Sequence, residues 1–587
     1  MARVSLRNRG RLSWLALRRG LDHAVARVLS HPLLQRPGWL RKADRIVIAP
    51  QDLRTADPTR AAEIYGGRFA FAGKVVVCDG RSVFEMVPPS DEWPEALLGF
   101  GWLRHLRAAE SAITRANARA LVDEWISLQG RWDAVAWRPE TLSRRVISWL
   151  TQATLILDEA DVKFYRRFLR NLARQLRYLR LMARGTRDGL PRLQARIALA
   201  YASLTMSSQV GHLRGAMRKL AAELDRQILP DGCHIGRNPG ALIELLLDLL
   251  PLAQAFTARN VAPPQALSNA IDRMMPMLRF FRHGDGIFAL FNGMGATSPE
   301  LIATILAYDD ARGEPVANAP HAGYQRIQAG STVLLMDTGA PPPIAVSSEA
   351  HAGCLSFEVS AKHQRIMVNC GLPITDKETW RQVARATAAH STVTFNDSSS
   401  CQFVESKAFR RLFGTPIAAG PTHVPVAREI GPDGTIMLRT AHDGYADRFG
   451  IVHHRILHVA ADGNKIDGED LFMPPDERML PANALDEFAL RFHLHPGVKA
   501  TRLTDGHGVM LILPNKDVWN FSSHEDRLDL DESVYLGGQE GPRRAMQIVI
   551  TGQARKVGRV HWTLSHVPQA GAATRRSGRG EEPQLPL

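Results

Sequence analysis

The hydrophobic pattern of this chain changes its period once, near Pro320, and this change constrains the fold more than any other feature. From about residue 92 to residue 310, apolar residues recur at i, i+3 and i+4, the spacing of one face of an α-helix. After Pro320, apolar and polar residues alternate, as they do along a half-buried β-strand. Helices that come first and strands that come second do not make βαβ units. The pattern therefore predicts an α+β protein with a helical domain and an antiparallel β domain.

The first half of the chain is expected to form helices of similar length, separated by breaks that hold Gly, Pro or Asp-Gly. The expected helices are Ala108–Leu128, Thr141–Leu157, Asp161–Ala183, Leu193–Met206, His212–Leu229, Pro239–Ala258, Pro264–Phe281 and Pro299–Asp310. Such helices with short turns form αα-hairpins, which stack either as a solenoid or as a closed toroid. No sequence signature repeats along this region, which disfavours an array of standard helical repeats.

The second half is expected to form a large antiparallel β-sandwich, because short alternating runs are separated by turns such as Asp-Gly. The expected strands are Thr332–Asp337, Leu355–Ser360, Arg365–Asn369, Ser391–Asn396, Ile436–Thr440, Arg455–Val459, Phe488–Leu494, Val509–Leu513 and Ala545–Thr551.

At 587 residues, the chain is too long for one compact core, and several domains are expected. Residues 1–90 are predicted to form a basic helix and a small β element. Residues 91–318 are predicted to form the helical domain, and residues 319–568 the β domain. Residues 569–587 are rich in Gly, Arg, Glu and Pro and are predicted to be a disordered tail.

The net charge of +14 suggests an anionic partner, which can be nucleic acid, an anionic lipid or an anionic polysaccharide. Nucleic acid fits least. The sequence has no glycine-rich RNA motif, no zinc-finger spacing and no aromatic platform among its basic residues. We therefore predict that the protein does not bind nucleic acid.

The N-terminal segment has the pattern of a basic amphipathic helix. Trp14, Leu17 and Leu21 recur at helical spacing, with Val25 and Val28 in the same register. Arginines at positions 7, 11, 18 and 27 lie beside them, so the helix is suited to peripheral contact with an anionic membrane. The alternative is a helix packed on its own protein with a solvated basic face.

Arg18-Arg19 interrupts the only apolar stretch near the N-terminus, which disfavours a signal peptide. A cytoplasmic location is the default prediction, and the cell envelope or the periplasm is the alternative.

Two histidines stand at the entry of predicted strands. His351 precedes the run that ends at Asn369, and His390 precedes the run that ends at Asn396. Histidines at the entries of neighbouring strands can converge as a metal site or an acid/base site. The alternative is that both are hydrogen-bonded residues at the start of a strand.

The segments around these histidines resemble the C-terminal domain of the heparinase II/III family. The matching text is His351-Ala352-Gly353, Ser356-Phe357-Glu358, Asn369-Cys370-Gly371 and Ala389-His390-Ser391-Thr392. In the helical half, Trp137-Arg138-Pro139 and Asp231-Gly232-Cys233-His234 are similar to landmarks of the same family.

The resemblance implies an N-terminal (α/α) toroid of helical hairpins, over residues 91–318, followed by a large antiparallel β-sandwich. It implies a lyase that cleaves an acidic, uronate-containing polysaccharide by β-elimination and requires no cofactor. In that reaction a base removes the proton at C5, next to a carboxylate that must be neutralised, and an acid protonates the leaving oxygen.

The resemblance also suggests the site. Glu349, His351 and His390 are the expected catalytic residues, with the carboxylate of Glu349 orienting the imidazole of His351. Four further residues are expected to bind substrate; they are His234, Arg237, Asn238 and Arg385. Arg237 can pair with a uronate carboxylate, whereas Asn238 can instead cap the helix that starts near Pro239.

The chain departs from the family's pattern at several of these positions. The segment 238–242 reads Asn-Pro-Gly-Ala-Leu where the family's catalytic tyrosine is expected. Glu349 replaces the first histidine of a His-x-His cluster, and Gly353 replaces its aspartate. Two hypotheses follow, namely a lyase with a non-standard active site and a catalytically inactive glycan-binding or envelope-polysaccharide assembly protein.

Some family members hold a zinc ion with residues that correspond to His351, Asn369 and His390. Zinc prefers carboxylate, thiolate or imidazole ligands to a neutral amide, so Asn369 weakens such a site. A structural zinc on His351 and His390 is therefore expected only if Cys370 or Glu349 compensates.

Overall fold

The computed structural model describes residues 44–568, apart from 129–133, 310–312, 374–377, 407–409, 411–413, 476–484 and 524–527. It also describes seven helical positions of the N-terminal segment, namely 10, 13, 14, 17, 20, 21 and 24. The predicted tail at 569–587 lies outside the described residues, as does most of the predicted basic helix.

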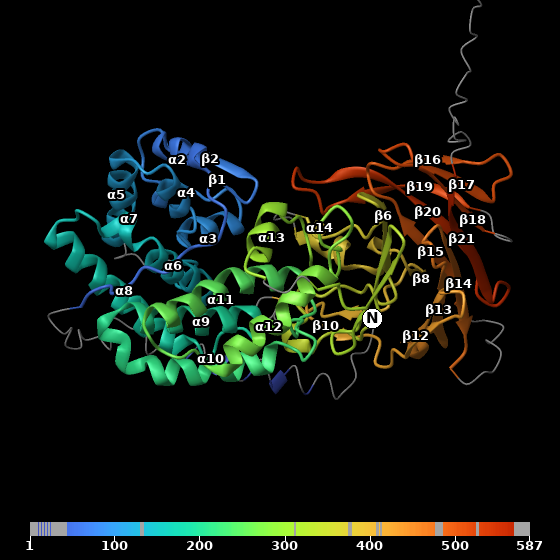
Figure 1. The fold of residues 1–587 in the computed structure, drawn as a ribbon, viewed down its shortest axis with the longest axis horizontal. Helices are drawn as coiled ribbons and strands as arrows, with labels where there is room; N and C mark the ends of the chain where they lie inside the picture. The colour runs from blue at the N-terminus through green and yellow to red at the C-terminus, as the bar shows by residue number, and fades with distance from the viewer. Residues whose placement is uncertain are drawn as a thin grey trace, which may run out of the picture.

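The small β element predicted before residue 90 is a hairpin. Helix α2 (Pro58–Tyr65) leads into strands β1 (Arg68–Phe71) and β2 (Lys74–Val77), which pair antiparallel. The short helices α3 (Glu92–Leu98) and α4 (Leu103–Ala108) pack beneath them (Figure 1). Phe69, Trp93 and Trp102 are buried at this contact, so the hairpin belongs to the core of the helical domain.

The predicted helices of the first half are all present, with ends that shift by a few residues. They are α5 (Ala112–Leu128), α6 (Pro139–Thr151), α7 (Ala153–Leu157), α8 (Val162–Met182), α9 (Leu190–Thr205), α10 (Leu213–Gln227), α11 (Gly240–Ala258), α12 (Gln265–Phe280) and α13 (Pro299–Leu306). The run expected as one helix over 141–157 is two helices. The chain breaks at Gln152, whose buried side chain donates to Asp52 at 3.3 Å.

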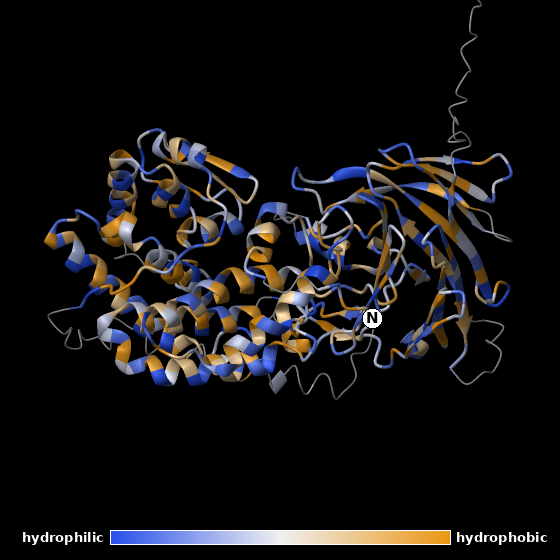
Figure 2. Ribbon diagram, in the orientation of Figure 1, coloured by the Kyte–Doolittle hydropathy of each residue, from blue (hydrophilic) through white to orange (hydrophobic). Residues whose placement is uncertain are grey.

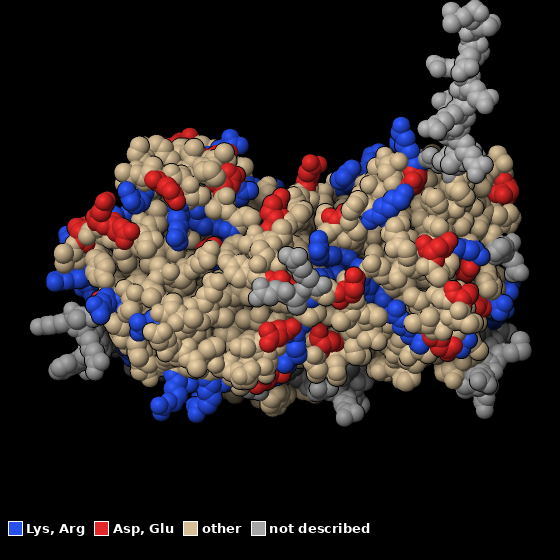
Figure 3. Space-filling view, in the orientation of Figure 1, with Lys and Arg blue, Asp and Glu red and all other residues tan. Residues whose placement is uncertain are grey.

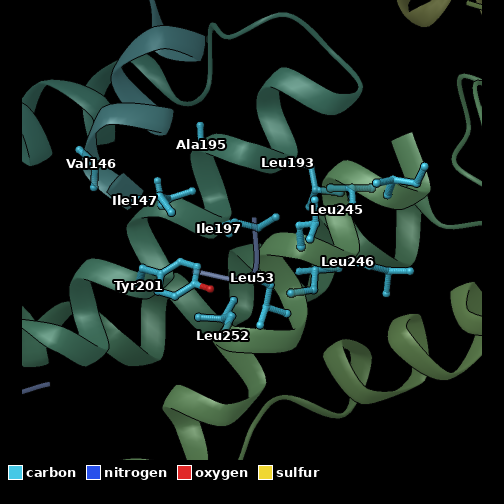
Figure 4. Close-up of a cluster of buried hydrophobic side chains, with 14 of the residues drawn as sticks. Leu53, Val146, Ile147, Leu193, Ala195, Ile197, Tyr201, Leu245, Leu246 and Leu252 are labelled. Atoms are coloured by element: carbon cyan, nitrogen blue, oxygen red, sulfur yellow. The ribbon is translucent and has the colours of Figure 1, made fainter. Parts of the chain in front are cut away.

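Helix α9 lies at the centre of the helical domain and contacts α6, α10 and α11. Figure 4 shows Leu193 and Ile197 of α9 near Leu245 of α11, and Tyr201 of α9 beside Leu252 of α11. A helix that is apolar on every side is stable only when it is surrounded by protein. The sequence of α9 is therefore what places it inside the ring of other helices.

Helix α11 is, within the described part of the chain, the single helix long and apolar enough to cross a membrane by length and composition. Of its apolar window, 72% is buried inside the protein. This burial is typical of a core helix, and α11 packs against α9, α12 and α13, whose ribbons also carry hydrophobic residues in Figure 2.

The β domain is built from two main layers. One layer is an eight-stranded antiparallel sheet with the order β11-β12-β13-β14-β21-β18-β17-β16. The other combines a five-stranded sheet, β3-β4-β5-β6-β7, with a four-stranded sheet, β19-β20-β15-β8, joined by a bridge between Met367 and Leu494. Apolar residues from all three sheets form one core between the layers, so the predicted sandwich is confirmed.

The strands of the five-stranded sheet are β3 (Asn318–Ala319), β4 (Tyr324–Ala329), β5 (Thr332–Asp337), β6 (Phe357–Ala361) and β7 (Gln364–Met367). Those of the four-stranded sheet are β8 (Val393–Phe395), β15 (Glu487–His493), β19 (Asp529–Tyr535) and β20 (Arg543–Gln553). The eight-stranded sheet has β11 (Val426–Ile430), β12 (Ile436–Tyr445), β13 (Ile451–Val459), β14 (Lys465–Met473), β16 (Lys499–Arg502), β17 (Gly508–Ile512), β18 (Val518–Ser523) and β21 (Arg559–Val567). A short pair, β9 (Gln402–Phe403) and β10 (Ile417–Ala419), lies outside these sheets.

Each of the nine predicted strands overlaps a strand of the structure. The prediction missed others, including β14 and β21, which pair with each other in the middle of the eight-stranded sheet. Their outward faces carry charged residues and histidines, which breaks the apolar signal.

Candidate functional site

His351 and His390 converge, and their side chains form a hydrogen bond with each other. Nδ1 of His351 lies 3.0 Å from Nε2 of His390. Nδ1 of His390 donates to the carbonyl oxygen of Ala386 at 2.8 Å, so its Nε2 is the acceptor in the histidine pair. Both side chains are buried, with 4% and 1% exposure. Burial lowers the pKa of both imidazoles, so both are neutral at pH 7.

One ring nitrogen of the histidine pair makes no hydrogen bond within the described residues. Nε2 of His351 is buried and has no hydrogen-bond partner among the described residues. Because Nδ1 carries the proton, Nε2 holds a free lone pair. The amide nitrogen of Asn369 is also buried without a partner, while its Oδ1 accepts from the backbone N–H of Ser391 at 3.0 Å.

The loop that carries His351 is tied to the helical domain through Asn292. The Oδ1 of Asn292 accepts from the backbone N–H of His351 at 3.2 Å, and its Nδ2 donates to Tyr324 at 2.7 Å and to Asp337 at 2.8 Å. The hydroxyl of Tyr324 donates in turn to the carbonyl of Arg237 at 2.6 Å. Tyr324 is fully buried, and burial raises the pKa of its hydroxyl, so it is not placed to act as an acid on a substrate.

Arg237 lies in the same network. Its guanidinium forms an ion pair with Asp337 and donates to the carbonyls of Ala322, Gly323, Gly339 and Ala340. The side chain is 7% exposed. Every direction of the guanidinium fork is thus used inside the protein, which leaves no bidentate face for a uronate carboxylate. The predicted contact with substrate is not available in this arrangement.

His234 and Asn238 also have internal partners. Nδ1 of His234 accepts from the backbone N–H of Gly236 at 3.0 Å, and its Nε2 lies 3.0 Å from Oε1 of Gln227. Burial lowers the pKa of His234 to about 4. Oδ1 of Asn238 accepts from the backbone N–H of Gly240, the first residue of α11, at 2.8 Å. This bond ties Asn238 to the start of α11 in the manner of the capping alternative, although the residue directly before the helix is Pro239.

Arg385 ends helix α14 (Glu378–Arg385) and holds the loop before His351 in place. Its guanidinium donates to the carbonyls of Ala350 at 2.8 Å and Ser347 at 3.1 Å, and it lies over the ring of Phe403. Burial lowers its pKa to about 10. Arg385 is therefore near the histidines, as expected, but it positions a loop with its charge turned inward.

Glu349 is exposed on the surface, and no hydrogen bond joins its carboxylate to His351 within the described residues. The expected Glu349–His351 acid/base pair is replaced by the pair of histidines. The side chain of Glu349 is exposed whereas that of His351 is buried, so the two side chains do not meet.

Gly353 explains how His390 fits. A Cβ atom at Gly353 would lie 2.7 Å from Cδ2 of His390 and 3.2 Å from its Nε2. An aspartate at this position would meet the imidazole ring directly. The glycine is therefore what allows His390 to pack against the loop and to reach His351.

Two residues that hold this region together, His283 and Asp337, were not predicted from the sequence. His283, in the loop after α12, lies 3.0 Å from Oε2 of Glu358 and 2.9 Å from the hydroxyl of Ser360, both on β6. Oε1 of Glu358 accepts from the backbone N–H groups of Leu290 and Asn369. The Ser-Phe-Glu motif was a signal for Glu358, but nothing in the sequence pointed to His283 or to Asp337 as partners across the two domains.

The donor set does not fit a zinc ion. The described residues contain no group of three or more His, Cys, Asp or Glu side chains that could hold a metal. The two imidazoles face each other, but the third position is the amide of Asn369, whose oxygen is already an acceptor. Cys370, the suggested replacement, lies 3.7 Å from His493 instead. The zinc site stays a prediction, and the residues around the histidine pair do not support it.

These features define a class of protein. A helical domain of hairpins is followed by an antiparallel β-sandwich, and this order of domains is that of the heparinase III fold. Residues 311–563 match the family described as Heparinase II/III-like, C-terminal. The chain belongs to the heparinase II/III family.

Among its relatives is the FtsZ-localized protein C of Caulobacter vibrioides (strain NA1000 / CB15N). It is 32% identical over 543 residues, which cover 90% of this chain and 91% of the relative. The fold is similar to that of crystalline heparinase III, with a TM-score of 0.70 and 13% identity over 96% of this chain and 92% of the other. It is also similar to a mutant of the heparan sulfate lyase HepC from Pedobacter heparinus, with a TM-score of 0.60 and 15% identity over 94% and 88% of the two chains.

Proposed function

We propose that this protein is a non-catalytic member of the heparinase II/III family that associates with FtsZ and uses the lyase fold as a scaffold. The relative with 32% identity over nearly the whole length of both chains is named for localisation with FtsZ. The likeness to the lyases is confined to the fold, at 13 to 15% identity.

The observation that supports a non-catalytic role is that the two histidines are buried and hydrogen-bonded to each other. A general base must reach the proton that it removes, within hydrogen-bond distance of the substrate. His351 and His390 are 4% and 1% exposed and are bonded to each other. The cation expected to neutralise the uronate, Arg237, is enclosed by Asp337 and four carbonyl groups.

The N-terminal helix supports a second part of the proposal, a peripheral contact with an anionic membrane. Trp14, Leu17 and Leu21 are helical and are 57%, 65% and 59% exposed. Their spacing of three and four residues puts them on one face of the helix. An exposed apolar stripe that contains a tryptophan suits the boundary between lipid headgroups and acyl chains. In this proposal the protein is cytoplasmic and acts at the inner face of the cell envelope.

A lyase with a non-standard site is the second candidate, and one observation favours it. Nε2 of His351 has a free lone pair and no partner among the described residues, which is what a general base needs once a substrate reaches it. In this reading the partner is an anionic polysaccharide and Glu349, on the surface, lines its path.

Two measurements on the full-length protein separate the candidates. In the first, labelled FtsZ is titrated with the protein, and saturable binding is expected. In the second, the protein is mixed with a panel of uronic-acid polymers, and absorbance near the ultraviolet cutoff is expected to stay flat because no unsaturated uronate forms.

His351→Ala and His423→Ala are compared in the second measurement, since His423 is an exposed histidine of the β domain. A rise in absorbance that His351→Ala removes and His423→Ala leaves intact would establish the lyase and overturn the non-catalytic proposal. Absence of FtsZ binding would overturn the proposed association whatever the polymers show.

A further inference from the structure

A basic pocket lies on the helical domain, between α8, α9 and the start of α10. Its volume is about 160 Å³. Arg180 comes from the last turn of α8, Arg196 and Ser203 from α9, and His212 and Lys219 from the start of α10 and its second turn. None of these residues belongs to the histidine pair or to the Arg237 network, and nothing in the proposed function uses them.

The positive charges around this pocket are not balanced. No ion pair within the described residues joins Arg180, Arg196 or Lys219 to a carboxylate. Burial and the charges of Arg196, Arg184, Arg218 and Arg180 lower the pKa of Lys219, which means that these cations repel each other. Glu223, the acidic group whose charge acts on Arg196, is engaged with Arg226 at 2.7 Å and Gln227 at 2.9 Å.

Arg196 gives the clearest sign that a ligand is missing. Its side chain is only 8% exposed, it lines the pocket, and its Nε is buried without a hydrogen-bond partner. Burying an unpaired cation is costly unless an opposite charge meets it. Arg180 is a second cation at this pocket, and it donates a hydrogen bond to the neutral side chain of Gln209.

The start of α10 leaves room for an anion. The helix spans Leu213–Gln227 and has no acidic residue in its first turn. Gly211 and Gly215 line the pocket, and a Cβ at either would meet nothing within 4 Å, so space remains beside the backbone. The short 3₁₀ helix Ser207–His212 runs directly into α10, and the N–H of Leu213 donates to the carbonyl of Val210, so an anion is held here by side chains and not by free N–H groups of the helix. Figure 3 shows Lys and Arg side chains projecting from the lower edge of the helical domain, where Figure 1 places α10.

We infer that this pocket binds a phosphate group, held by Arg180, Arg196 and Lys219. The volume is below the roughly 300 to 1,000 Å³ of sites that enclose drug-sized ligands, so the pocket fits one small anionic group and not a stretch of sugar chain. The same group is carried by free phosphate and by the headgroup of an anionic lipid.

The test uses the full-length protein and two probes. Inorganic phosphate is titrated by calorimetry at low ionic strength, and flotation is measured with phosphatidylcholine vesicles that contain phosphatidic acid. Arg196→Gln is expected to weaken phosphate binding by about tenfold or more, because it removes charge-assisted hydrogen bonds. Lys219 is exposed, so the variant Lys219→Gln should fold normally. We expect it to weaken phosphate binding by about fivefold.

Arg214→Gln is the matched control, since Arg214 is an exposed arginine of α10 that does not line the pocket. If the phosphate group belongs to a lipid, flotation falls in Arg196→Gln and Lys219→Gln, and free phosphate binds weakly to the wild-type protein. If the ligand is free phosphate, both variants bind it more weakly in calorimetry, and their flotation is unchanged. The inference is overturned if the wild-type protein binds neither probe, or if Arg196→Gln and Lys219→Gln bind both as the control does.

Discussion

The imidazole of His390 has its place because residue 353 is a glycine. The ring occupies the volume that any larger side chain at Gly353 would need, and from there its Nε2 accepts the hydrogen bond from Nδ1 of His351. One departure from the family's pattern therefore has a structural reason that is separate from catalysis. The departure allows two histidines to bond to each other in a buried space.

Gly353→Ala is expected to lower the free energy of unfolding by about 1 to 3 kcal/mol, because the new methyl group would displace the ring of His390 and lengthen its bond to His351. The measurement is the urea midpoint of the purified variant.

Gly558→Ala provides the control for this change. A Cβ at Gly558 meets nothing within 4 Å, so its midpoint should stay close to that of the wild-type protein. Equal midpoints for Gly353→Ala and the wild-type protein would mean that the ring of His390 does not depend on the glycine.

At the level of elements, the two domains are joined by polar side chains at the ends of helices and strands. Arg237, in the loop before α11, pairs with Asp337 at the end of β5. His283, after α12, meets Glu358 of β6. The apolar core of the helical domain continues across this junction to residues such as Tyr324 and Val368. The residues expected to line a cleft thus hold the domains together.

Asp337→Asn is expected to lower the free energy of unfolding by about 3 to 5 kcal/mol, because it leaves the buried guanidinium of Arg237 without its counter-charge. Asp517→Asn breaks the ion pair of Asp517 with Lys362, whose side chain is 56% exposed, and should cost about 1 kcal/mol or less. Urea unfolding of both variants gives the comparison. A cost for Asp337→Asn no larger than that for Asp517→Asn would contradict a structural role for the Arg237 network.

At the scale of the whole molecule, the exposed apolar helix and the basic pocket are both separate from the buried histidine pair. The N-terminal helix exposes Trp14, Leu17 and Leu21, and the basic pocket lies between α8 and α10. The histidine pair lies inside the junction of the two domains. The surfaces available to partners are therefore distinct from the place where a lyase of this fold would be expected to act.

The double variant Trp14→Glu, Leu17→Glu is expected to abolish association with vesicles that contain anionic lipid, since it puts charge on the apolar face of the helix. Ile430→Glu is the control, because Ile430 is 71% exposed on β11, far along the chain from the helix. The measurement is flotation of both variants and of the wild-type protein with these vesicles. Retained flotation of the double variant would mean that another surface contacts the membrane.

The candidate site could be predicted only in part. The approach of His351 and His390 follows from two strand-entry positions, and it was correct. The partner of His351 was predicted to be Glu349, its near neighbour in the sequence, but the structure supplies His390. Likewise Arg237 carries the charge expected of a uronate ligand, and only its contact with Asp337, one hundred residues away, reveals that the charge is already neutralised.

The sequence by itself determined the order of the two domains, the place of the helices and most strands, and the family. It could do so because hydrophobic period and turn residues act over a few neighbouring positions. Only the tertiary structure decided whether the polar residues at the junction face a ligand or each other. Burial and hydrogen-bond partners depend on segments far apart in the chain, so the neutral histidine pair and the enclosed Arg237 were not visible until those segments were brought together.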